Sequence, residues 1–375
     1  MLQIFLALGV LSLISWIAVW LRPGRPWDMR PVAEDEPALP DPPAWPAVRI
    51  VVPARNEAAA LPRTLPALAA QDYPGSWGIV VIDDRSEDDT AGQAAARGGA
   101  RTSVLRGKPL PEGWVGKVWA LEQAAEGATE PYLLLTDADI LHAPGSLRRL
   151  VAESERDGLA LNSRMARLRC ESPAERLLIP PFVWFFGLLY PMRRVAEPGR
   201  AAAAGGCVLL RRDALERAGG FASIRGEVID DVNLARRVQA AGGALRLSLS
   251  RSDVRSLREY ATLGPIWRMV RRTAFTELRR SWLRVIGALG SMLLMFAAPP
   301  LLLVAGAALA PTDPRFLTAA GLGLAAWALP AALYRPAMRF FALAGIRAWT
   351  LPLAGAAYAL MTLDSALRGG RRDWR

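Results

Sequence analysis

Lysine, histidine and cysteine are scarce in this 375-residue chain, and each shortage excludes something. The single histidine, His142, and two cysteines without ligand spacing, Cys170 and Cys207, exclude a zinc cluster of the usual composition. A stabilising disulfide is not expected, because the middle of the chain is predicted to be cytoplasmic. Among 46 basic residues only Lys108 and Lys117 are lysines, so both stand out against a general arginine bias.

The net charge of +11 is not accompanied by a recognisable nucleic-acid-binding module, and the arginines are scattered along the whole chain. Nucleic acid is therefore not an expected partner. We expect the charge to favour anionic lipid headgroups and a negatively charged substrate.

Hydrophobic residues make up 52% of the chain and gather at its two ends. The run Leu2–Leu21 is long enough to cross ~30 Å of hydrocarbon. A secretory signal is the alternative, but the run lacks a basic segment before it and a small-x-small cleavage site after it. We therefore predict a retained anchor over residues 1–22, and the arginines that follow place its end in the cytoplasm: Arg22, Arg25 and Arg30.

The C-terminal region 285–367 is expected to be a second membrane region, followed by a basic tail over 368–375. Its candidate spans are Val285–Ala310, Phe316–Tyr334 and Phe341–Leu363. Three spans would put the C-terminus on the side opposite the central domain, whereas the arginines of the tail favour the same side. One of these segments is then re-entrant or interfacial, and the sequence leaves open which one. The tail arginines are Arg368, Arg371, Arg372 and Arg375.

The central part of the chain is predicted to be one α/β domain over residues 47–284, reached by a Pro- and acid-rich linker over 23–46. Apolar strand-like runs alternate with helical stretches, which is typical of a largely parallel sheet covered on both faces. Ligands of such sheets bind beyond the carboxyl ends of the strands. The predicted strands are Val48–Pro53, Ile79–Asp83, Thr102–Leu105 and Tyr132–Thr136, and the predicted helices are Glu57–Ala70, Glu87–Ala96 and Lys117–Ala125.

One aromatic stretch inside this domain, Ile179–Met192, is too short to span a bilayer. A buried helix is one interpretation. Its aromatic density and the flanking Arg193 and Arg194 favour a segment lying in the membrane interface.

The strongest chemical signal is Thr136-Asp137-Ala138-Asp139 at the end of an apolar strand. Two carboxylates separated by one residue can hold Mg²⁺ or Mn²⁺ and, through the metal, a diphosphate. A solvated acidic turn is the alternative interpretation. We predict that Asp137 and Asp139 are metal ligands.

Two further carboxylate pairs end or begin predicted elements. Asp83-Asp84 closes a strand, where it can accept hydrogen bonds from a base or ribose, and Ser86 is expected near the N-cap of the next helix. Asp230-Asp231 begins a helix, where N-capping competes with a role as general base.

Together these motifs resemble the family 2 glycosyltransferases with the GT-A fold, in the right order from Val48 to Arg272. The resemblance rests on four segments: Val51–Glu57, Ile82–Thr90, Thr136–Asp139, and Gly219-Gly220-Phe221 followed by Asp230-Asp231. It implies an inverting transfer with Asp231 as base beside Asp230, and a UDP-sugar as the expected donor. It also implies a nucleotide pocket that contains Pro53, Arg55, Glu57, Asp83, Asp84, Lys117 and Asp137.

The resemblance is incomplete in two places. Family members commonly carry Glu-Asp at Asp230-Asp231, and processive members carry Gln/Arg-x-x-Arg-Trp where this chain lacks the tryptophan. Its absence argues against a processive polymer synthase. The arginines there remain candidates for diphosphate or acceptor contacts, or face lipid headgroups: Arg268, Arg271 and Arg272.

Within the family, the segment Trp114–Ala120, the anchor and the multi-span tail resemble bacterial hopanoid-associated glycosyltransferases. That resemblance implies a lipid hydroxyl as acceptor, on a hopanoid or related polycyclic lipid, and a catalytic domain at the cytoplasmic face of the inner membrane. Three alternatives stay open: a polyprenyl-phosphate sugar synthase, a nucleotidyltransferase, and a non-catalytic membrane scaffold that retains the fold.

Overall fold

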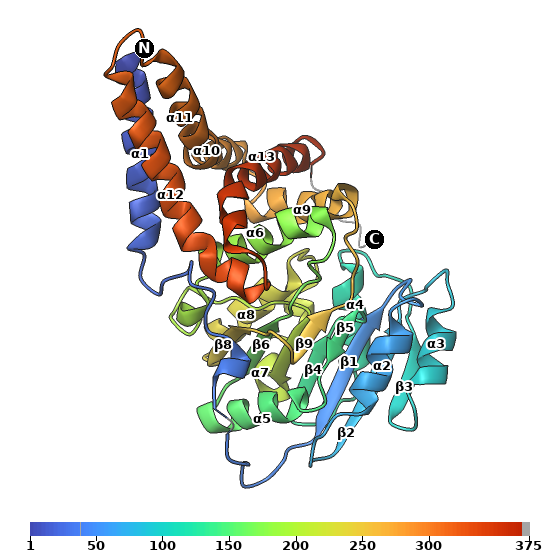
Figure 1. Ribbon diagram of the computed structural model, residues 1–375. Coiled ribbons are helices and arrows are strands. Elements are labelled where there is room, and N and C mark those ends of the chain that lie inside the picture. The colour runs from blue at the N-terminus through green and yellow to red at the C-terminus, as the bar shows by residue number, and fades with distance from the viewer. Residues whose placement is uncertain (38, 370–375) are drawn as a thin grey trace. The chain divides into compact units, whose positions relative to one another are not determined.

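The computed structural model describes residues 1–37 and 39–369, which form two units (Figure 1). The sheet unit comprises residues 30–169 and 190–259 of the described chain. The helical unit comprises residues 1–29, 170–189 and the described residues from 260 onward. The domain expected over 47–284 is thus shared between the units, since its last part and the stretch 170–189 belong to the helical unit.

The sheet unit is built on seven strands in the order β3-β2-β1-β4-β7-β6-β8. The pairs β1–β2, β2–β3, β1–β4 and β6–β8 are parallel, whereas β7 runs antiparallel to both of its neighbours. The predicted mostly parallel sheet is confirmed. Its strands are β1 Val48–Ala54, β2 Trp77–Asp83, β3 Thr102–Arg106, β4 Tyr132–Thr136, β6 Leu161–Met165, β7 Cys207–Arg211 and β8 Leu245–Leu249.

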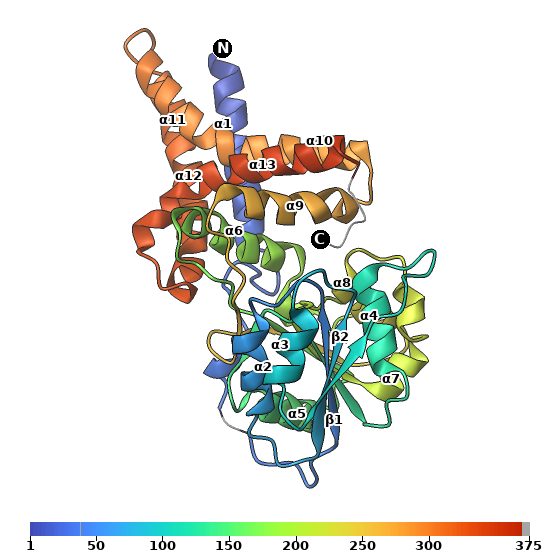
Figure 2. The same ribbon diagram turned by 90° about the vertical axis from the view of Figure 1, so that its right-hand side faces the viewer.

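Helices and a small second sheet complete this unit (Figure 2). The second sheet pairs β5 Ile140–His142 with β9 Val254–Ser256. The helices are α2 Leu61–Ala69, α3 Thr90–Arg97, α4 Gly116–Ala125, α5 Ser146–Asp157, α7 Arg212–Arg217 and α8 Asp230–Ala240, with short 3-10 turns at Ala33–Asp35, Met192–Arg194 and Phe221–Ile224.

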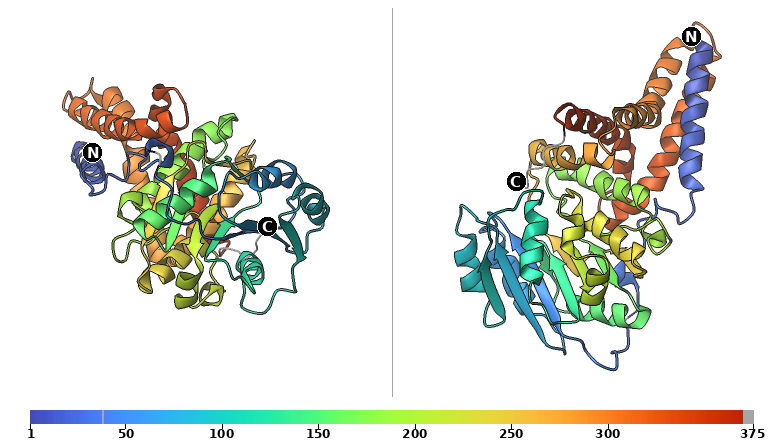
Figure 3. Two further views of the ribbon diagram at one scale, coloured as in Figure 1. Left: turned by 90° about the horizontal axis from the view of Figure 1, so that it is seen from below. Right: turned by 180° about the vertical axis from the view of Figure 1, so that it is seen from behind.

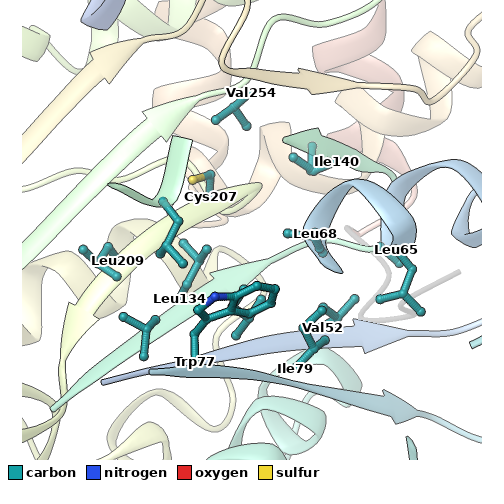
Figure 4. Close-up of a cluster of buried hydrophobic side chains, with 14 of the residues drawn as sticks. Val52, Leu65, Leu68, Trp77, Ile79, Leu134, Ile140, Cys207, Leu209 and Val254 are labelled. Carbon is teal, nitrogen blue, oxygen red and sulfur yellow. The ribbon is translucent and has the colours of Figure 1, made fainter. Parts of the chain in front are cut away.

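Successive side chains of β1 point to opposite faces of the sheet, and both faces are covered by helices. Ile50 and Val52 belong to the large buried cluster that includes Leu65 and Leu68 of α2, as Figure 4 shows for part of it. Val51 is equally buried but points away from that cluster, toward the face where α4 contacts β1 and β2. Apolar burial on both faces fixes the strand register and therefore the position of the residues at its carboxyl end.

The predicted cap of α3 is wrong. This helix begins at Thr90, later than expected, and Ser86 does not cap it. The Ser86 hydroxyl instead accepts a hydrogen bond from the amide of Asn56, and Asp88 accepts one from the amide of Ala58. Hydrogen bonds therefore connect the turn after β2 to the turn after β1. They are accepted by the polar side chains that the sequence analysis expected at the start of a helix.

The expected extended linker is docked on the sheet unit over most of its length. Val32 forms a bridge with Leu249, and one oxygen of Glu34 accepts bonds from the Ser250 hydroxyl and the amides of residues 251, 252 and 253. These bonds lower the pKa of Glu34 to about 2, although burial opposes the shift. Acidic side chains of the linker also pair with arginines of the sheet unit: Asp35 with Arg251, Glu36 with Arg246, and Asp41 with Arg148.

The helical unit contains three helices long and apolar enough to cross a membrane, counted over the described residues: Leu2–Trp20, Trp282–Leu309 and Phe316–Phe340. The second of these is α10, a short π-helical stretch and α11 in succession. The elements of this unit are α1 Leu2–Trp20, α6 Pro173–Leu189, α9 Leu263–Glu277, α10 Trp282–Met292, the π-helix Leu293–Ala297, α11 Ala298–Leu309, α12 Phe316–Phe340, the 3-10 turn η5 Gly345–Thr350 and α13 Leu351–Leu367.

Helices α1 and α12 lie side by side and run in the same direction (Figure 3). Near the beginnings of the two helices, the rings of Phe5 and Phe316 pack edge to face, with their centroids 5.7 Å apart. Further along, the place of a side chain at Gly9 is occupied by Leu322. The two helices therefore end at the same side of the helical unit.

The expected third span, Phe341–Leu363, is not one long helix. A turn and η5 separate α12 from α13, which has 17 residues and is not among the three candidate spans. The sequence left open which C-terminal segment does not cross, and within the described residues this segment is not among the helices long and apolar enough to do so. The basic tail beyond residue 369 lies outside the described residues.

The aromatic stretch expected at the membrane interface forms most of α6. Its Ile179 and Trp184 are fully buried, and Trp184 stacks on Trp16 of α1. The alternative of a buried helix therefore applies to one face of α6. Contact of the other face with lipid remains a prediction.

Candidate active site

Residues from four strands meet at one edge of the sheet. The strands β1, β2 and β4 are parallel, so Arg55, Asp84 and Asp137 follow their carboxyl ends at the same edge. Strand β7 is antiparallel, so its first residue pairs with Thr136, and Gly205 lies just before it. A cavity at this edge is lined by Pro53, Lys117, Thr136, Asp137, Gly205, Asp230 and Asp231, with apolar walls from Leu121, Leu135, Val208, Ile224 and Leu234.

Lys117, in the first turn of α4, forms ion pairs with carboxylates on two sides of this cavity. Its ammonium nitrogen lies 2.7 Å from a carboxylate oxygen of Asp137 and 3.5 Å from one of Asp230. Burial by itself would lower the pKa of Lys117, but the charges of Asp137, Asp230 and Asp231 raise it above its ordinary value. The lysine that stood out in the sequence therefore carries a firm positive charge between the Asp-x-Asp pair and the Asp-Asp pair.

Asp231 has the properties of a general base. One of its oxygens accepts a hydrogen bond from the Gly205 amide at 2.7 Å, and the other from the Val232 amide at 2.8 Å. Burial, followed by the charge of Asp230, raises the pKa of Asp231 to about 7, although Lys117 opposes the shift. The residue at the N-cap of α8 is Ile229, so the role of this carboxylate is not limited to capping. A carboxyl that titrates near neutrality is well matched to accepting a proton.

Asp137 and Asp139 present oxygen atoms suited to a hard cation. Asp139 accepts a hydrogen bond from the Ser256 hydroxyl at 2.6 Å, and the Arg258 guanidinium lies 3.4 Å from its other oxygen. Burial raises the pKa of Asp137 against the opposing charge of Lys117. Two cationic side chains thus approach the pair where a metal ion would bind.

No group of three or more acidic, histidine or cysteine side chains suited to a metal is present within residues 1–37 and 39–369. Mg²⁺ is often held by one or two carboxylates and completes its coordination with water and substrate phosphate. Asp137 and Asp139 fit such a site, since they are two hard ligands just after a strand end and Asp137 lines the cavity.

Apart from Lys117 and Asp137, the predicted nucleotide residues lie at or just after the ends of β1 and β2. Asp83 and Asp84 are almost fully buried, and the Arg55 guanidinium lies 3.8 Å from Asp84. Burial raises the pKa of Asp84, with the charge of Arg55 opposing it. Burial also raises the pKa of Glu57, whose carboxylate accepts a hydrogen bond from Arg258 at 2.6 Å. Arg258 thereby links Glu57 after β1 to Asp139 after β4.

Sequence reasoning missed Gly205, Ser256 and Arg258. A side chain at Gly205 would place its first carbon 3.1 Å from the Lys117 nitrogen and 3.3 Å from Asp231, so glycine leaves room for both. The pair Gly205-Gly206 before an apolar strand was an available signal. No local signal marks Ser256 or Arg258, because their partners are remote in the sequence.

Residues 49–219 match the protein-family model described as Glycosyl transferase family 2. This match covers slightly less than half of the chain, and it supports a family 2 glycosyltransferase domain. The matched residues include the Asp-x-Asp pair and Lys117, whereas Asp230 and Asp231 lie beyond the match.

Two curated proteins that are similar to this chain are also named as glycosyltransferases. The chain is 29% identical over 189 residues to an N-acetylglucosaminyltransferase of Mesorhizobium japonicum, which covers 48% of this chain and 43% of the relative. It is 36% identical over 110 residues to an uncharacterized glycosyltransferase of Mycobacterium bovis, which covers 29% of this chain and 44% of that protein. The chain thus spans less than half the length of either relative.

A solved structure extends the likeness in fold beyond the family 2 domain. The mannosyltransferase PcManGT from Pyrobaculum calidifontis, determined with GDP-Man and Mn²⁺, superimposes with a TM-score of 0.55 at 21% identity. The comparison covers 95% of this chain and 99% of the other. Together with the sheet order, it shows the GT-A fold predicted from the sequence.

The three arginines expected near a diphosphate lie in α9 of the helical unit. Within that unit, Arg271 lies 3.7 Å from Asp364, which also accepts a hydrogen bond from Trp267. Contact of Arg268, Arg271 and Arg272 with substrate remains a prediction.

Proposed function

We propose that this chain is a membrane-anchored glycosyltransferase that moves a sugar from a nucleotide-sugar to a hydroxyl of a lipid, with inversion at the anomeric carbon. The observation that carries the proposal is the cavity in which Lys117 joins Asp137 of the Asp-x-Asp pair to Asp230 beside Asp231. A carboxylate pair for a leaving diphosphate and a base for an incoming hydroxyl are thereby placed in one site.

Asp231 takes the proton of the acceptor hydroxyl, and the freed oxygen attacks the anomeric carbon while the nucleoside diphosphate departs from the opposite face. The Gly205 amide fixes the orientation of Asp231 through its 2.7 Å hydrogen bond. A divalent cation held by Asp137 and Asp139, Mg²⁺ or Mn²⁺, would neutralise charge that develops on the departing diphosphate. Lys117 supplies a fixed positive charge beside the same group.

The nucleotide binds along the ends of β1 and β2 in this proposal. Asp83 and Asp84 accept hydrogen bonds from base or ribose, and Arg55 and Glu57 line the same edge next to Pro53. The family 2 domain supports a nucleotide-sugar donor, for which the sequence resemblance favours UDP. The GDP-Man and Mn²⁺ in the solved mannosyltransferase support the same class of donor and a divalent metal.

The acceptor is proposed to be a membrane lipid because three apolar helices accompany the domain. With two candidate spans after the domain, the chain returns to the side of the sheet unit, which fits a cytoplasmic sheet unit at a bacterial inner membrane. The resemblance of Trp114–Ala120 to hopanoid-associated enzymes makes a polycyclic lipid alcohol the first acceptor to test.

The test is the release of nucleoside diphosphate from a panel of donors, by the purified full chain with a bacterial lipid extract and Mn²⁺ or Mg²⁺. We expect one donor to give lipid-dependent release and a glycolipid product. Release of pyrophosphate would instead indicate a nucleotidyltransferase. Donor binding without turnover across a wide set of acceptors would indicate a non-catalytic scaffold.

A further inference from the structure

A second cavity, of about 460 Å³, lies in the helical unit at the end of α12, where the chain turns into η5. Its apolar lining is contributed by Met338, Leu343, Ile346 and Trp349. Arg335 and Arg339 line the same space. The cavity is therefore amphipathic, with an apolar wall and two guanidinium groups.

The two arginines lack acidic partners. They are four residues apart on α12, so they share one face of the helix, where like charges repel. Over residues 1–37 and 39–369, neither of them is in an ion pair, and the same holds for the exposed Arg347 of η5. Two guanidinium groups without acidic partners, lining one cavity, favour an anionic occupant.

The cavity lies at the end of a candidate membrane span. Helix α12 is one of the three spans, and Arg339 is in its last turn. Since α1 and α12 run in parallel, the arginines after α1, Arg22 and Arg25, lie at the same side of this unit. A concentration of arginine at one end of apolar helices marks the cytoplasmic membrane surface.

The apolar wall points to a lipid as the source of the anion. Ile346 is 73% exposed although it is aliphatic, and Leu343 and Trp349 are only partly buried. Such side chains suit acyl chains and the interfacial region, where tryptophan is common. A free phosphate ion would use the arginines but leave this apolar surface in water.

We propose that the cavity at the end of α12 binds the phosphate headgroup of an anionic phospholipid from the cytoplasmic leaflet. Arg335 and Arg339 bind the phosphodiester, and Leu343, Ile346 and Trp349 contact the glycerol and the upper acyl chains. Arginine suits this role because its planar donors can bind two phosphate oxygens at once. The inference rests on the membrane location within the proposed function, but not on the proposed chemistry.

The experiment measures lipid retained by the purified full chain in native mass spectrometry, after exposure to equal amounts of phosphatidylglycerol and phosphatidylcholine. We expect the unaltered chain to retain phosphatidylglycerol preferentially. The variant R335Q/R339Q should lose that preference by about fivefold for each arginine removed. The matched control R279Q/R284Q removes two exposed charges beside the start of α10 and should retain the preference.

A second variant fills the cavity without removing a charge. Gly345 also lines it, and a side chain there would meet no atom within 4 Å, so Gly345→Phe has room to fold. It should lower phosphatidylglycerol retention as R335Q/R339Q does. Equal retention by G345F and the unaltered chain would overturn the proposal, because the lipid would then be held by the surface charge alone.

Three other results would also overturn it: no preference in the unaltered chain, equal losses in R335Q/R339Q and R279Q/R284Q, or displacement of the lipid by an equal concentration of inorganic phosphate. Nucleoside diphosphate release is measured on the same samples. A chain that retains phosphatidylglycerol but releases no diphosphate contradicts the proposed function only. A chain that turns over without the preference contradicts the lipid site only.

Discussion

At Lys117, one ammonium group joins the carboxylate of Asp137, directly after β4, to that of Asp230 in α8, and these two residues are far apart in the sequence. Like charges at such short range would repel each other without it, and burial would favour protonation of the acids. Lys117 therefore organises the site and opposes the rise in the pKa of Asp137 and of Asp231. The scarcity of lysine in the chain identified this residue, but only the fold shows its partners.

Changing Asp231 to Asn should lower turnover by about 10²-fold or more, because the amide cannot accept the acceptor proton. Donor binding should change little, since Asp231 contacts the amides of Gly205 and Val232. Steady-state rates with lipid extract, together with donor titration, measure the two effects. A loss much smaller than 10²-fold would favour an acceptor that needs no base, such as a polyprenyl phosphate.

The pH profile should report the environment of Asp231. A base must be deprotonated, and burial raises the pKa of this carboxyl to about 7, so kcat/KM should fall as pH drops through neutrality. In the variant D230N, the neighbouring negative charge is gone and the acid limb should move to lower pH. An acid limb that stays in place in D230N would show that Asp230 does not influence the base.

Gly205→Ala should lower turnover by roughly tenfold while leaving the fold intact. The added carbon would lie 3.1 Å from the Lys117 nitrogen and 3.3 Å from Asp231, so both must shift slightly. Gly145→Ala is the matched control, because its added carbon meets no atom within 4 Å. Equal turnover in the two variants would show that the close approach at Gly205 has no catalytic value.

The linker preceding β1 behaves as part of the sheet unit. Removing the Glu34 carboxylate in E34A should lower the free energy of unfolding by about 2 kcal/mol, since it accepts several hydrogen bonds as a charged group. The control E112A changes an exposed glutamate and should have little effect. Chemical unfolding of the full chain in detergent measures both.

The same carboxylate predicts an acid dependence. Its pKa falls from 4.5 to about 2 on folding, so its contribution is complete above about pH 4.5 and is lost as pH falls toward 2. E34Q has no carboxylate at this position. The difference in free energy of unfolding between E34Q and the unaltered chain should therefore shrink as pH falls from about 4.5 toward 2. A constant difference between the two proteins from pH 5 to pH 2.5 would contradict this assignment.

Strands β1 and β4 were the most predictable elements because each is a short apolar run that is buried on both faces of the sheet. Helix beginnings were less predictable. The helix after β2 was expected at Glu87 but begins at Thr90, because Ser86 and Asp88 bond to the turn after β1. The docking of the linker was missed for a similar reason, since its acids pair with arginines about 200 residues away.

The same limit applies to the site. The Asp-x-Asp and Asp-Asp pairs were visible because each follows a recognisable local pattern. Arg258 was not, because its partners Glu57 and Asp139 come from other parts of the chain. A sequence motif shows which groups are present, whereas their pairing depends on the order of strands in the sheet.

The molecule as a whole combines a GT-A sheet unit with a helical unit that has three candidate spans. One candidate span precedes the sheet unit and two follow it. If all three cross as proposed, the loop between α11 and α12 lies on the outer side of the membrane. A cysteine at the exposed Thr312 should react with an impermeant reagent in intact cells, in a chain whose Cys170 and Cys207 are serines. A cysteine at Ser281, before α10, should react only after the cells are opened. The reverse pattern would contradict this topology.

The most direct test of the account compares the unaltered chain with D137N/D139N in nucleoside diphosphate release from the preferred donor, across a Mn²⁺ titration with lipid present. The account predicts metal-dependent release by the unaltered chain and a loss of at least about 10²-fold in the variant at every metal concentration. Equal release by the two proteins would contradict the claim that this carboxylate pair enables the sugar to leave its diphosphate.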